Sequence, residues 1–510
     1  MFNAVFSGGN QGMVAYLVRV EVDLSRGLPG FDVVGSVGIE VREARERVQI
    51  ALKNAGYPIP VCKAIINLSP AHIRKEGTGY DLAIAAGILA CMEVWNAESL
   101  PNTAFLGELA LNGEVRQIKG ALPIVLKLKK QGISQVVLPL ENGLECTAVP
   151  GIQLMGIRNM SEFITFLRCD TESRNVYSVK EEDKEKKGTV SNHKLDFADV
   201  YGQEGAKRAA EVAAAGFHHL MLTGPPGAGK TMIAQRIPSI LPPLTEEEQL
   251  EVSSIYSVAG KLEGRLMKSR PFLASHHTIS PQAFAGGGRI PNPGIISLAH
   301  RGVLFLDEMP EFSSSVLEVL RQPMEDKVVQ IARSQGTYTF PSNFMLVCAM
   351  NPCPCGYFPD RNKCVCTEPD IRRYLSRISG PILDRIDIMT QASSVTIKDL
   401  QMKSGGEETD TIRQRVMKAR MRQKKRYQGS GYQFNGELPG REVERYVSLL
   451  SEEQSYLEKV FETGQLSTRS YHKIIKLART IADLEGMEKI KSSHLAEAVC
   501  YNSGKKRFFQ

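Results

Sequence analysis

A glycine-rich segment in the middle of the sequence carries the clearest chemistry. It matches the pattern G-x-x-x-x-G-K-[ST], with an apolar strand, HLMLT, before it and a helical run, MIAQRI, after it. In such a loop the backbone N–H groups surround phosphate oxygens, the lysine reaches the β- and γ-phosphates, and the hydroxyl ligates Mg²⁺. The pattern predicts an ATP site formed by Gly224, Pro225, Pro226, Gly227, Ala228, Gly229, Lys230 and Thr231, together with Val200 and Tyr201 upstream.

An acidic segment further along supplies the carboxylates that an ATP site needs. The run Gly302–Glu308 places four apolar residues before Asp307 and Glu308, which predicts a buried central strand with two carboxylates at its C-terminal end. Open α/β sheets bind ligands at that edge. We expect Asp307 to hold Mg²⁺ and Glu308 to polarise the water that attacks ATP.

Four cysteines lie within fourteen residues, at Cys353, Cys355, Cys364 and Cys366. Zn²⁺ prefers four soft ligands in a tetrahedron, and two C-x-C halves joined by a loop can close around one ion. The usual spacing is C-x-x-C, so a redox-labile pair or unligated thiols remain open alternatives. A zinc clip at this place would be structural and would brace the loop that follows Asn351.

Three segments carry positive charge, in a chain with 63 basic and 56 acidic residues and a net charge of +7. Gly286–Gly288 followed by Arg289 predicts a mobile loop that ends in a cation, and the alternating run from Val328 to Phe340 predicts a hairpin with Arg333 near its tip. Both suit a sugar-phosphate backbone, but a flexible surface loop and a surface hairpin are the alternatives.

The third segment is a basic run without an acidic residue, comprising Arg413, Arg415, Lys418, Arg420, Arg422, Lys424, Lys425 and Arg426. Neutralisation of nucleic-acid phosphates is one explanation, with Lys418 and Arg422 as candidate DNA contacts. A solvated helix that joins two domains is the other, because cations spaced two apart spread around a helix.

Secondary-structure patterns indicate how these residues are positioned. Strands and helices alternate from Gly202 to about Ile388, which predicts a parallel sheet between helices, and the pattern after Gly406 is wholly helical. Upstream, alternating valines from Val14 to Val22 and an apolar helix at Asp81–Met92 indicate a separate α/β domain. The predicted division of the chain is an N-terminal domain at 1–169, a charged flexible linker at 170–194, a core at 195–400, a basic connector at 401–436 and a helical lid at 437–510.

The length of 510 residues, 42% of them hydrophobic and 23% charged, is typical of a globular chain with about three domains. No apolar run approaches the eighteen or so residues that a membrane helix needs, and the N-terminus has no pattern of a secretory signal. We therefore expect a cytoplasmic protein without a membrane partner.

The two nucleotide motifs resemble those of the AAA+ ATPases, and the resemblance implies roles for further residues. Asn351 matches the first sensor, Arg469 matches the second sensor on the helical lid, and Arg385 matches the arginine finger that reaches a neighbouring subunit's nucleotide. A planar guanidinium suits the charge that develops in phosphoryl transfer. Arg377 competes with Arg385 for the finger role, and each arginine can instead be a salt-bridge residue.

The resemblance narrows at His276–Phe312 and Ala478–Gly486, which are similar to the magnesium-chelatase-like branch, and the chain as a whole resembles the YifB/ComM family. This implies a cytoplasmic homohexameric ATPase that acts on single-stranded or branched DNA. For ComM it implies a helicase that drives branch migration as transforming DNA integrates, with recombinases or other DNA-processing proteins as partners. The branch carries two extra elements, which here correspond to Thr278–Pro293 and Val328–Ser342.

The N-terminal segments Arg74–Asp81 and Phe105–Arg116 resemble the proteolytic domain of Lon. The position of the family's serine nucleophile falls on Gly79, and that of its lysine falls near Leu122, with Lys119 close by. A base without a nucleophile is inert, so the resemblance implies a Lon-like fold without protease activity. Two alternatives to a DNA motor remain: a metal-chelatase motor subunit that remodels a protein partner, and an ATP-dependent protease.

Overall fold

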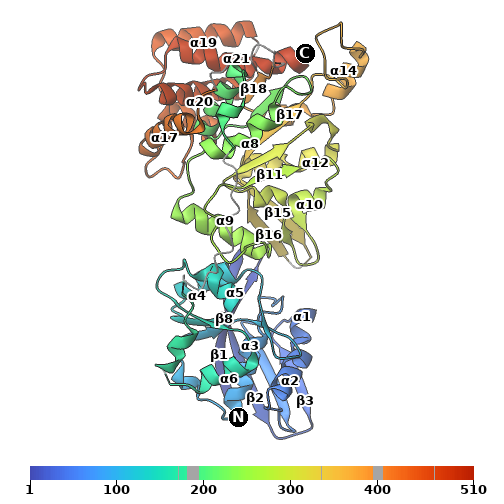
Figure 1. Ribbon diagram of the computed structural model, residues 1–510, viewed down its shortest axis with the longest axis vertical. Helices are drawn as coiled ribbons and strands as arrows, with labels where there is room; N and C mark the ends of the chain where they lie inside the picture. Colours follow the sequence, from blue (N-terminus) through green and yellow to red (C-terminus); the bar gives the residue numbers. More distant parts are fainter. Residues whose placement is uncertain (171, 181–194, 335, 394–405, 465, 510) are drawn as a thin grey trace.

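The computed structural model describes the chain except residues 171, 181–194, 335, 394–405, 465 and 510. An N-terminal α/β lobe, a second α/β lobe and a group of helices follow one another along the long axis of the molecule (Figure 1). The predicted fold class, an α/β protein with a parallel-sheet core, a helical C-terminal part and an N-terminal α/β domain, is confirmed. Within the described ranges, no helix is both long enough and apolar enough to cross a membrane.

The N-terminal lobe is built on a seven-stranded sheet with the order β3-β4-β2-β1-β5-β8-β9. Its strands are β1 (Phe2–Gln11), β2 (Val14–Ser25), β3 (Gly30–Val34), β4 (Lys63–Ser69), β5 (Thr103–Phe105), β8 (Gln135–Pro139) and β9 (Gln153–Ile157). β1, β2 and β4 pair antiparallel, and their other neighbours are parallel. Val18, Val20 and Val22 of β2 are fully buried, as the period-two pattern predicts.

Helices and a short two-stranded ribbon complete this lobe. They are α1 (Ile39–Arg42), α2 (Ala44–Asn54), α3 (Asp81–Cys91), α4 (Ala121–Lys130), α5 (Leu140–Cys146), α6 (Met160–Arg168), β6 (Glu108–Leu109) and β7 (Val115–Arg116). α3 is buried along its whole length. It lies close to the sheet because Gly87 faces Val22, whose side chain would stand 2.6 Å from a Cβ at this position.

The segment predicted as a flexible linker begins with packed structure. The 3₁₀ helix η2 (Ser173–Tyr177) buries Arg174, whose Nε donates to the carbonyl oxygen of Phe166 at 3.1 Å. The backbone N–H of Val179 donates to the carbonyl of Leu154 at 2.9 Å. Residues 172–180 therefore belong to the N-terminal lobe and correct the linker prediction there, while residues 181–194 lie outside the described residues.

The second lobe holds a five-stranded parallel sheet with the order β11-β14-β17-β10-β18. Its strands are β10 (Leu220–Thr223), β11 (Phe272–Ser275), β14 (Val303–Leu306), β17 (Met345–Met350) and β18 (Ile388–Gln391). β10, β14 and β17 are buried on both faces, which explains their continuous apolar runs. The apolar strand expected before the phosphate loop is β10, and the buried strand expected before Asp307 and Glu308 is β14.

Short helices and two hairpins surround this sheet. They are α7 (Glu204–Gly216), α8 (Lys230–Ile240), α9 (Glu246–Val258), α10 (Pro281–Ala285), α11 (Ile295–Leu298), α12 (Ser314–Val319), α13 (Arg321–Asp326), α14 (Glu368–Leu375), α15 (Gly380–Leu383), β12 (Gly286–Gly287) with β13 (Asn292–Pro293), and β15 (Val328–Arg333) with β16 (Gly336–Pro341). The hairpin predicted over 328–342 is thus present, with Val328 opposite Pro341 in the register.

The C-terminal part is helical, as predicted. Its helices are α17 (Thr409–Arg426), α18 (Gly440–Tyr446), α19 (Ser451–Gly464), α20 (Thr468–Glu485) and α21 (Ser492–Phe509). Ile412, Val416 and Ala419 of α17 recur at helical spacing and share one hydrophobic core with α7, α8 and α20. The helices therefore pack onto the ATPase-like sheet and do not form a separate core.

The N-terminal lobe docks on the second lobe through α9 and the β15–β16 hairpin (Figure 1). Ser257 of α9 lies at the first contact: its Oγ donates to Glu145 Oε1 at 3.1 Å and accepts from the backbone N–H of Leu122 at 3.3 Å. Tyr338 of the hairpin lies at the second contact and donates its hydroxyl to Glu76 Oε2 at 3.4 Å. Glu145 and Tyr338 are buried, so the two lobes share a partly dry interface.

Candidate active site

The predicted phosphate loop connects β10 to α8 at the C-terminal end of the parallel sheet. Gly227 and Gly229 have φ values of 75° and 78°, a left-handed conformation that favours glycine. Gly224 is required for another reason, because a Cβ there would stand 2.3 Å from the carbonyl oxygen of Ala392. α8 begins at Lys230, so the positive end of an eleven-residue helix points into the loop.

Carboxylate, amide, hydroxyl and ammonium groups converge beside this loop. Thr231 Oγ1 donates to Asp307 Oδ2 at 2.9 Å, and Lys230 Nζ donates to Asn351 Oδ1 at 3.1 Å. With Glu308 they line a cavity of about 440 Å³ together with loop residues 226–229. Residues predicted from three separate motifs therefore meet at one place, beyond the ends of β10, β14 and β17.

Two features of this cavity bear on its chemistry. Burial lowers the pKa of Lys230, and the negative charges of Asp307 and Glu308 oppose that shift. Lys230 also donates to the carbonyl oxygens of Gly224 (2.7 Å) and Pro225 (2.9 Å), so its ammonium group is held directly over the loop. Glu308 has a φ of 51°, an uncommon value for a residue other than glycine, and its carboxylate is exposed to the cavity.

Val200 and Tyr201, predicted to contact the nucleotide, do not line this cavity. Val200 is buried in the hydrophobic core that contains Phe197, and Tyr201 is 41% exposed. Both precede α7, so they lie near the sheet that carries the loop but are not brought to the phosphate-binding residues.

The three arginines with predicted roles also lie outside the phosphate-loop cavity. Arg385 and Arg469 line another cavity, of about 620 Å³, between the sheet and the C-terminal helices. Arg377 is separate from both, since its guanidinium lies 2.8 Å from Glu311 just after the acidic strand. The structure thus brings Arg385 and Arg469 together, and neither guanidinium reaches the phosphate loop of its own chain.

The four cysteines form one cluster, with all four sulfur atoms within 4.8 Å of one another. The Sγ of Cys353 lies 3.4 Å from that of Cys355 and 3.8 Å from that of Cys364. A tetrahedral Zn²⁺ with bonds of about 2.3 Å needs sulfur atoms about 3.8 Å apart, so the arrangement fits this ion. A hydrogen bond from the backbone of Tyr357 lowers the pKa of Cys355 to about 6, whereas burial raises the pKa of Cys364, so Cys355 is the more readily deprotonated of these two thiols.

The loop that carries these cysteines lies directly on the phosphate loop. A Cβ on Gly356 would stand 2.5 Å from Cδ of Pro226 and 3.7 Å from Cγ of Asn351. The contact requires glycine at position 356, because any side chain there would collide with Pro226. No motif in the sequence indicates it. The cysteine cluster is therefore positioned to brace both the phosphate loop and Asn351.

The candidate DNA contacts of the two hairpins differ in their surroundings. Arg333 is exposed at the end of β15, where it pairs in the register with Gly336, and Gln335 at the tip lies outside the described residues. Arg289 lies 3.7 Å from Glu40 of the N-terminal lobe, with its side chain 63% exposed. Both are open to a ligand, and Arg333 is the less constrained of the two.

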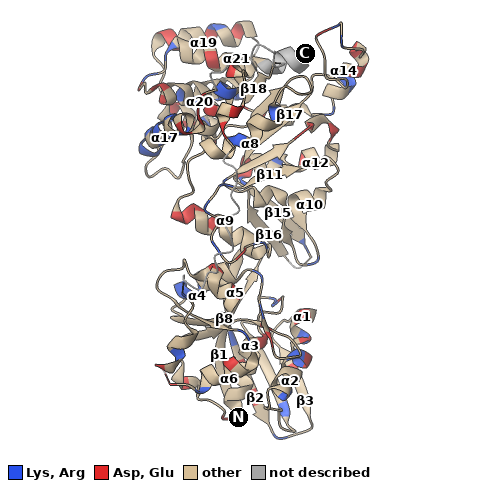
Figure 2. Ribbon diagram, viewed as in Figure 1, with Lys and Arg blue, Asp and Glu red and all other residues tan. Residues whose placement is uncertain are grey.

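Basic residues recur along α17 (Figure 2). Their side chains divide into those that are paired within the fold and those that are exposed. Arg415 pairs with Glu211 at 2.5 Å, Arg426 pairs with Asp483 at 2.6 Å, and Arg420 lies over the ring of Phe434. Lys418 is exposed, while Arg422 is exposed but donates to the carbonyl of Asp483 at 2.8 Å.

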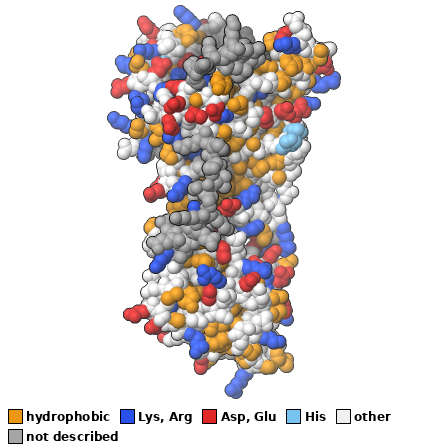
Figure 3. All heavy atoms as spheres, viewed as in Figure 1, with side chains coloured by type: hydrophobic (Ala, Val, Ile, Leu, Met, Phe, Trp, Pro, Cys, Tyr) orange, Lys and Arg blue, Asp and Glu red, His pale blue; other side chains and the backbone are white. Residues whose placement is uncertain are grey.

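The face in Figure 3 mixes basic and acidic side chains. Because Arg415, Arg420 and Arg426 are engaged in ion pairs or ring packing, only part of the charge of α17 is free for a ligand.

The position equivalent to a protease nucleophile gives no catalytic group. A Cβ on Gly79 would stand 3.2 Å from Ile118, and Leu122 is fully buried. The stem of Lys119 packs on Gly260 of the second lobe, and Ser257 binds the backbone of Leu122. The part of the N-terminal lobe around Lys119 and Leu122 therefore packs against the second lobe, on the segment from α9 to Gly260.

Comparisons with known proteins were consistent along the whole chain. The family described as magnesium chelatase, subunit ChlI, matches residues 196–400. The family described as subunit ChlI of Mg-chelatase matches residues 20–142, and its C-terminal counterpart matches residues 406–502. The three matches thus cover both lobes and the C-terminal helices.

Full-length relatives are also similar. The chain is 39% identical over 502 residues to the competence protein ComM of Haemophilus influenzae, covering 98% of this chain and 97% of the relative. It is 40% identical over 497 residues to YifB of Escherichia coli, covering 96% of this chain and 95% of the relative. The magnesium-chelatase 67 kDa subunit of Heliobacterium mobile is 26% identical over 196 residues, covering 31% of this chain and 28% of that subunit.

Proposed function

Since the chain belongs to the YifB/ComM family of magnesium-chelatase-like proteins, we propose that it is an ATP-dependent DNA motor. The family indicates an ATPase of the AAA+ type. We further propose that it works as a homohexamer on single-stranded or branched DNA and promotes branch migration during homologous recombination or the integration of transforming DNA.

The observation that supports ATP hydrolysis is the convergence of Lys230, Thr231, Asp307, Glu308 and Asn351 on one cavity. Lys230 neutralises the β- and γ-phosphates, and Asn351, which Lys230 contacts, orients the attacking water with Glu308. Thr231 and Asp307 would hold Mg²⁺, which supplies charge neutralisation of the phosphates when bound. In this proposal Arg385 contacts the nucleotide of a neighbouring copy, and Arg469, which lines the same cavity, contacts that nucleotide as well.

The DNA substrate is supported by similarity and charge together. The similarity to a competence protein covers nearly the whole chain, whereas similarity to the chelatase subunit of Heliobacterium mobile covers 31% of it. Arg333 and Arg289 offer exposed cations on hairpins, and Lys418 offers one on α17. These groups suit contact with a sugar-phosphate backbone without reading bases. A chelatase motor is the second candidate, and the N-terminal lobe without a nucleophile at Gly79 argues against a protease.

We also propose that Cys353, Cys355, Cys364 and Cys366 hold a structural Zn²⁺. Four protein ligands leave no open position for chemistry, so the ion would act through the contact of Gly356 with Pro226.

ATP turnover with and without DNA tests the proposal. The purified protein should hydrolyse ATP faster with single-stranded DNA or a synthetic four-way junction, and should migrate the junction in an ATP-dependent way. Glu308→Gln should retain ATP binding and lose about 10²- to 10⁴-fold in turnover, because it removes the general base. Turnover unaffected by either DNA, with no salt-dependent DNA binding, would reject the motor and favour the chelatase candidate.

A further inference from the structure

One carboxylate, that of Glu325, forms ion pairs with both Arg385 and Arg469. Glu325 is the penultimate residue of α13, and its Oε1 lies 2.6 Å from Arg385 Nη2 and 3.0 Å from Arg469 Nη2. Arg385 follows α15, and Arg469 lies in the first turn of α20. Three elements distant in sequence therefore meet at a single oxygen atom.

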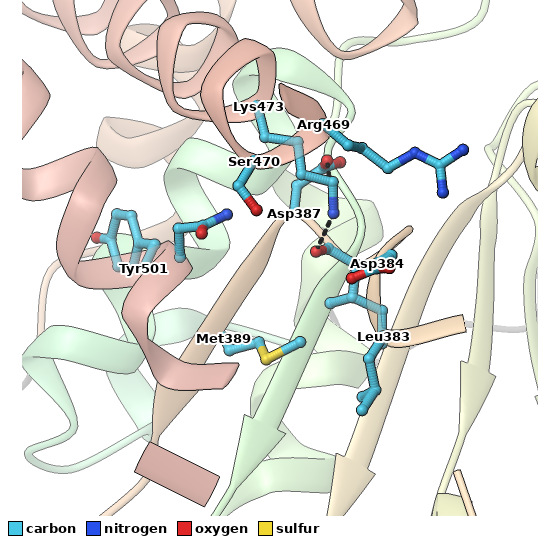
Figure 4. A pocket seen from close by; sticks show the side chains of 10 residues that line it. Leu383, Asp384, Asp387, Met389, Arg469, Ser470, Lys473 and Tyr501 are labelled. Atoms are coloured by element: carbon cyan, nitrogen blue, oxygen red, sulfur yellow. Dashed lines mark hydrogen bonds and ion pairs between the residues drawn. The ribbon is translucent and has the colours of Figure 1, made fainter. Parts of the chain in front are cut away.

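These three side chains lie near the N-terminal ends of the parallel strands, whereas the phosphate loop lies at the C-terminal ends. Their cavity of about 620 Å³ is lined by His219 and Asp387, which precede β10 and β18, whereas the loop follows the C-terminal end of β10. Figure 4 shows the adjoining part of this region, with Arg469 and Lys473 on the same helix above the segment 383–387. In this conformation the two arginines line a cavity that is separate from the phosphate-loop cavity of their own chain.

The surroundings favour an anion at this surface. Arg385, Arg469, Lys327, Lys473 and Lys476 line the cavity. Burial lowers the pKa of the three lysines and so disfavours their charged form, which leaves the two arginines as the permanent cations. Among the described residues, Nε of Arg385 is buried without a hydrogen-bond partner.

The acidic residues of the cavity are engaged in different ways. Asp387 pairs with Lys473 and His218, and Glu437 accepts from Asn343 Nδ2 at 2.7 Å. Glu325 differs from these because it is 46% exposed and its ion pairs join the two arginines. The Arg469–Glu325 pair is about half exposed (51% and 46%), whereas the Arg385 side chain is 11% exposed, so only the first pair is of the weak, solvated kind. A phosphate group carries more charge than a carboxylate and competes with Glu325 for both guanidinium groups.

We propose that Glu325 is a positioning residue that holds Arg385 and Arg469 side by side and competes with the γ-phosphate of a nucleotide bound to an adjacent copy. This inference rests on the proposed ATPase function of an oligomer. When that copy binds ATP, the phosphate replaces the carboxylate on both guanidinium groups. After hydrolysis and loss of phosphate, Glu325 forms its ion pairs with Arg385 and Arg469 again. The residue thereby makes the affinity for ATP depend on contact between copies.

Glu325→Gln tests the competition, because the amide keeps the shape and the acceptor oxygen but loses the charge. We expect the KM for ATP of the assembled protein to fall by about 3- to 10-fold, with kcat changed less than about twofold, since a competitor of ground-state binding is removed. Glu162→Gln is the control. Glu162 is also a partly exposed glutamate paired with an arginine, Arg158 at 3.6 Å, but this pair lies in the N-terminal lobe. Its KM should equal that of the wild type.

The same substitution in an Arg385→Ala/Arg469→Ala background decides whether Glu325 acts through these arginines. Because both arginines take part in the proposed hydrolysis, the affinity for ATP is measured here as a dissociation constant by direct nucleotide binding. The effect of Glu325→Gln on this affinity should disappear, whereas a merely structural role would leave it unchanged and overturn the proposal. An unaltered KM in Glu325→Gln, with a native unfolding temperature, would also overturn it. Failure of the ATPase proposal itself is distinct, because the wild type would then show no turnover sensitive to Glu308→Gln.

Discussion

Thr231 Oγ1 lies 2.9 Å from Oδ2 of Asp307, and this contact joins the start of α8 to the end of β14. The two oxygens are ligand types that Mg²⁺ prefers. They lie at one end of the sheet, after β10 and β14, which are separated in the sheet by β17. The preformed pair reduces the reorganisation that binding of a Mg²⁺–nucleotide complex requires.

Thr231→Ala should raise the Mg²⁺ concentration needed for half-maximal ATP turnover by about one order of magnitude or more, because it removes an oxygen from the metal site. Thr231→Ser keeps the hydroxyl and should behave like the wild type. Titration of Mg²⁺ at fixed ATP measures both. Equal Mg²⁺ requirements for the alanine and serine variants would contradict the assigned role.

The cysteine cluster makes a second prediction about metal content. Purified protein should contain one equivalent of zinc by elemental analysis, and the Cys353→Ser/Cys355→Ser variant should contain none. Loss of the ion should also raise the KM for ATP, because Gly356 of this loop packs on Pro226. Cys500→Ser is the control, since Cys500 is exposed and outside the cluster. Wild-type protein purified without chelators yet free of zinc would exclude the metal site and leave the redox or free-thiol alternatives.

The phosphate loop, its acidic strand and the cysteine cluster could be predicted because each is local in the sequence. A strand such as β14 is a continuous apolar run, and its two carboxylates follow immediately. The contact between Glu325 and the two arginines could not be predicted, since it joins residues from three elements whose relative positions depend on the packing of the whole lobe. The same holds for Gly356 against Pro226.

The basic run of α17 shows a second limit of sequence reasoning. Its cations are contiguous in the sequence, yet Arg415 and Arg426 are neutralised by Glu211 and Asp483, which lie far away along the chain. The net charge of a segment therefore overestimates how many of its basic side chains are available to bind an anion. Among the four predicted DNA contacts, Arg289 lies near Glu40 and Arg422 donates to the carbonyl of Asp483. The exposed Lys418 and Arg333 are therefore the better candidates.

Arg333→Ala should weaken DNA binding equally for different sequences, because a backbone contact reads no bases. The dependence of log K on log salt should fall by about 0.9 for each duplex phosphate that the variant no longer neutralises. ATP turnover without DNA should stay unchanged, since Arg333 is remote from the phosphate loop. Arg116→Ala, on an exposed arginine of the N-terminal lobe, serves as the control. An unchanged salt dependence would assign β15–β16 to lobe packing alone.

Glu145 at the lobe interface predicts a pH dependence of stability. Burial raises the pKa of this carboxyl to about 7, although Asn142 and Ser257 donate hydrogen bonds to it and oppose the shift. The folded protein thus favours the protonated form. Its contribution to the free energy of unfolding is fully present below the ordinary value of 4.5 and is lost as pH rises through about 7. By linkage the loss amounts to about 3 kcal/mol at most.

Glu145→Gln removes the titration while keeping an amide of the same size in the interface. Its stability relative to the wild type should therefore rise between pH 5 and pH 8, as measured by urea unfolding at each pH. Glu141→Gln, an exposed glutamate on the same helix α5, should follow the wild-type profile at both values. Parallel profiles for Glu145→Gln and the wild type would mean that Glu145 ionises without cost, and that the contact with Ser257 does not couple the two lobes to pH.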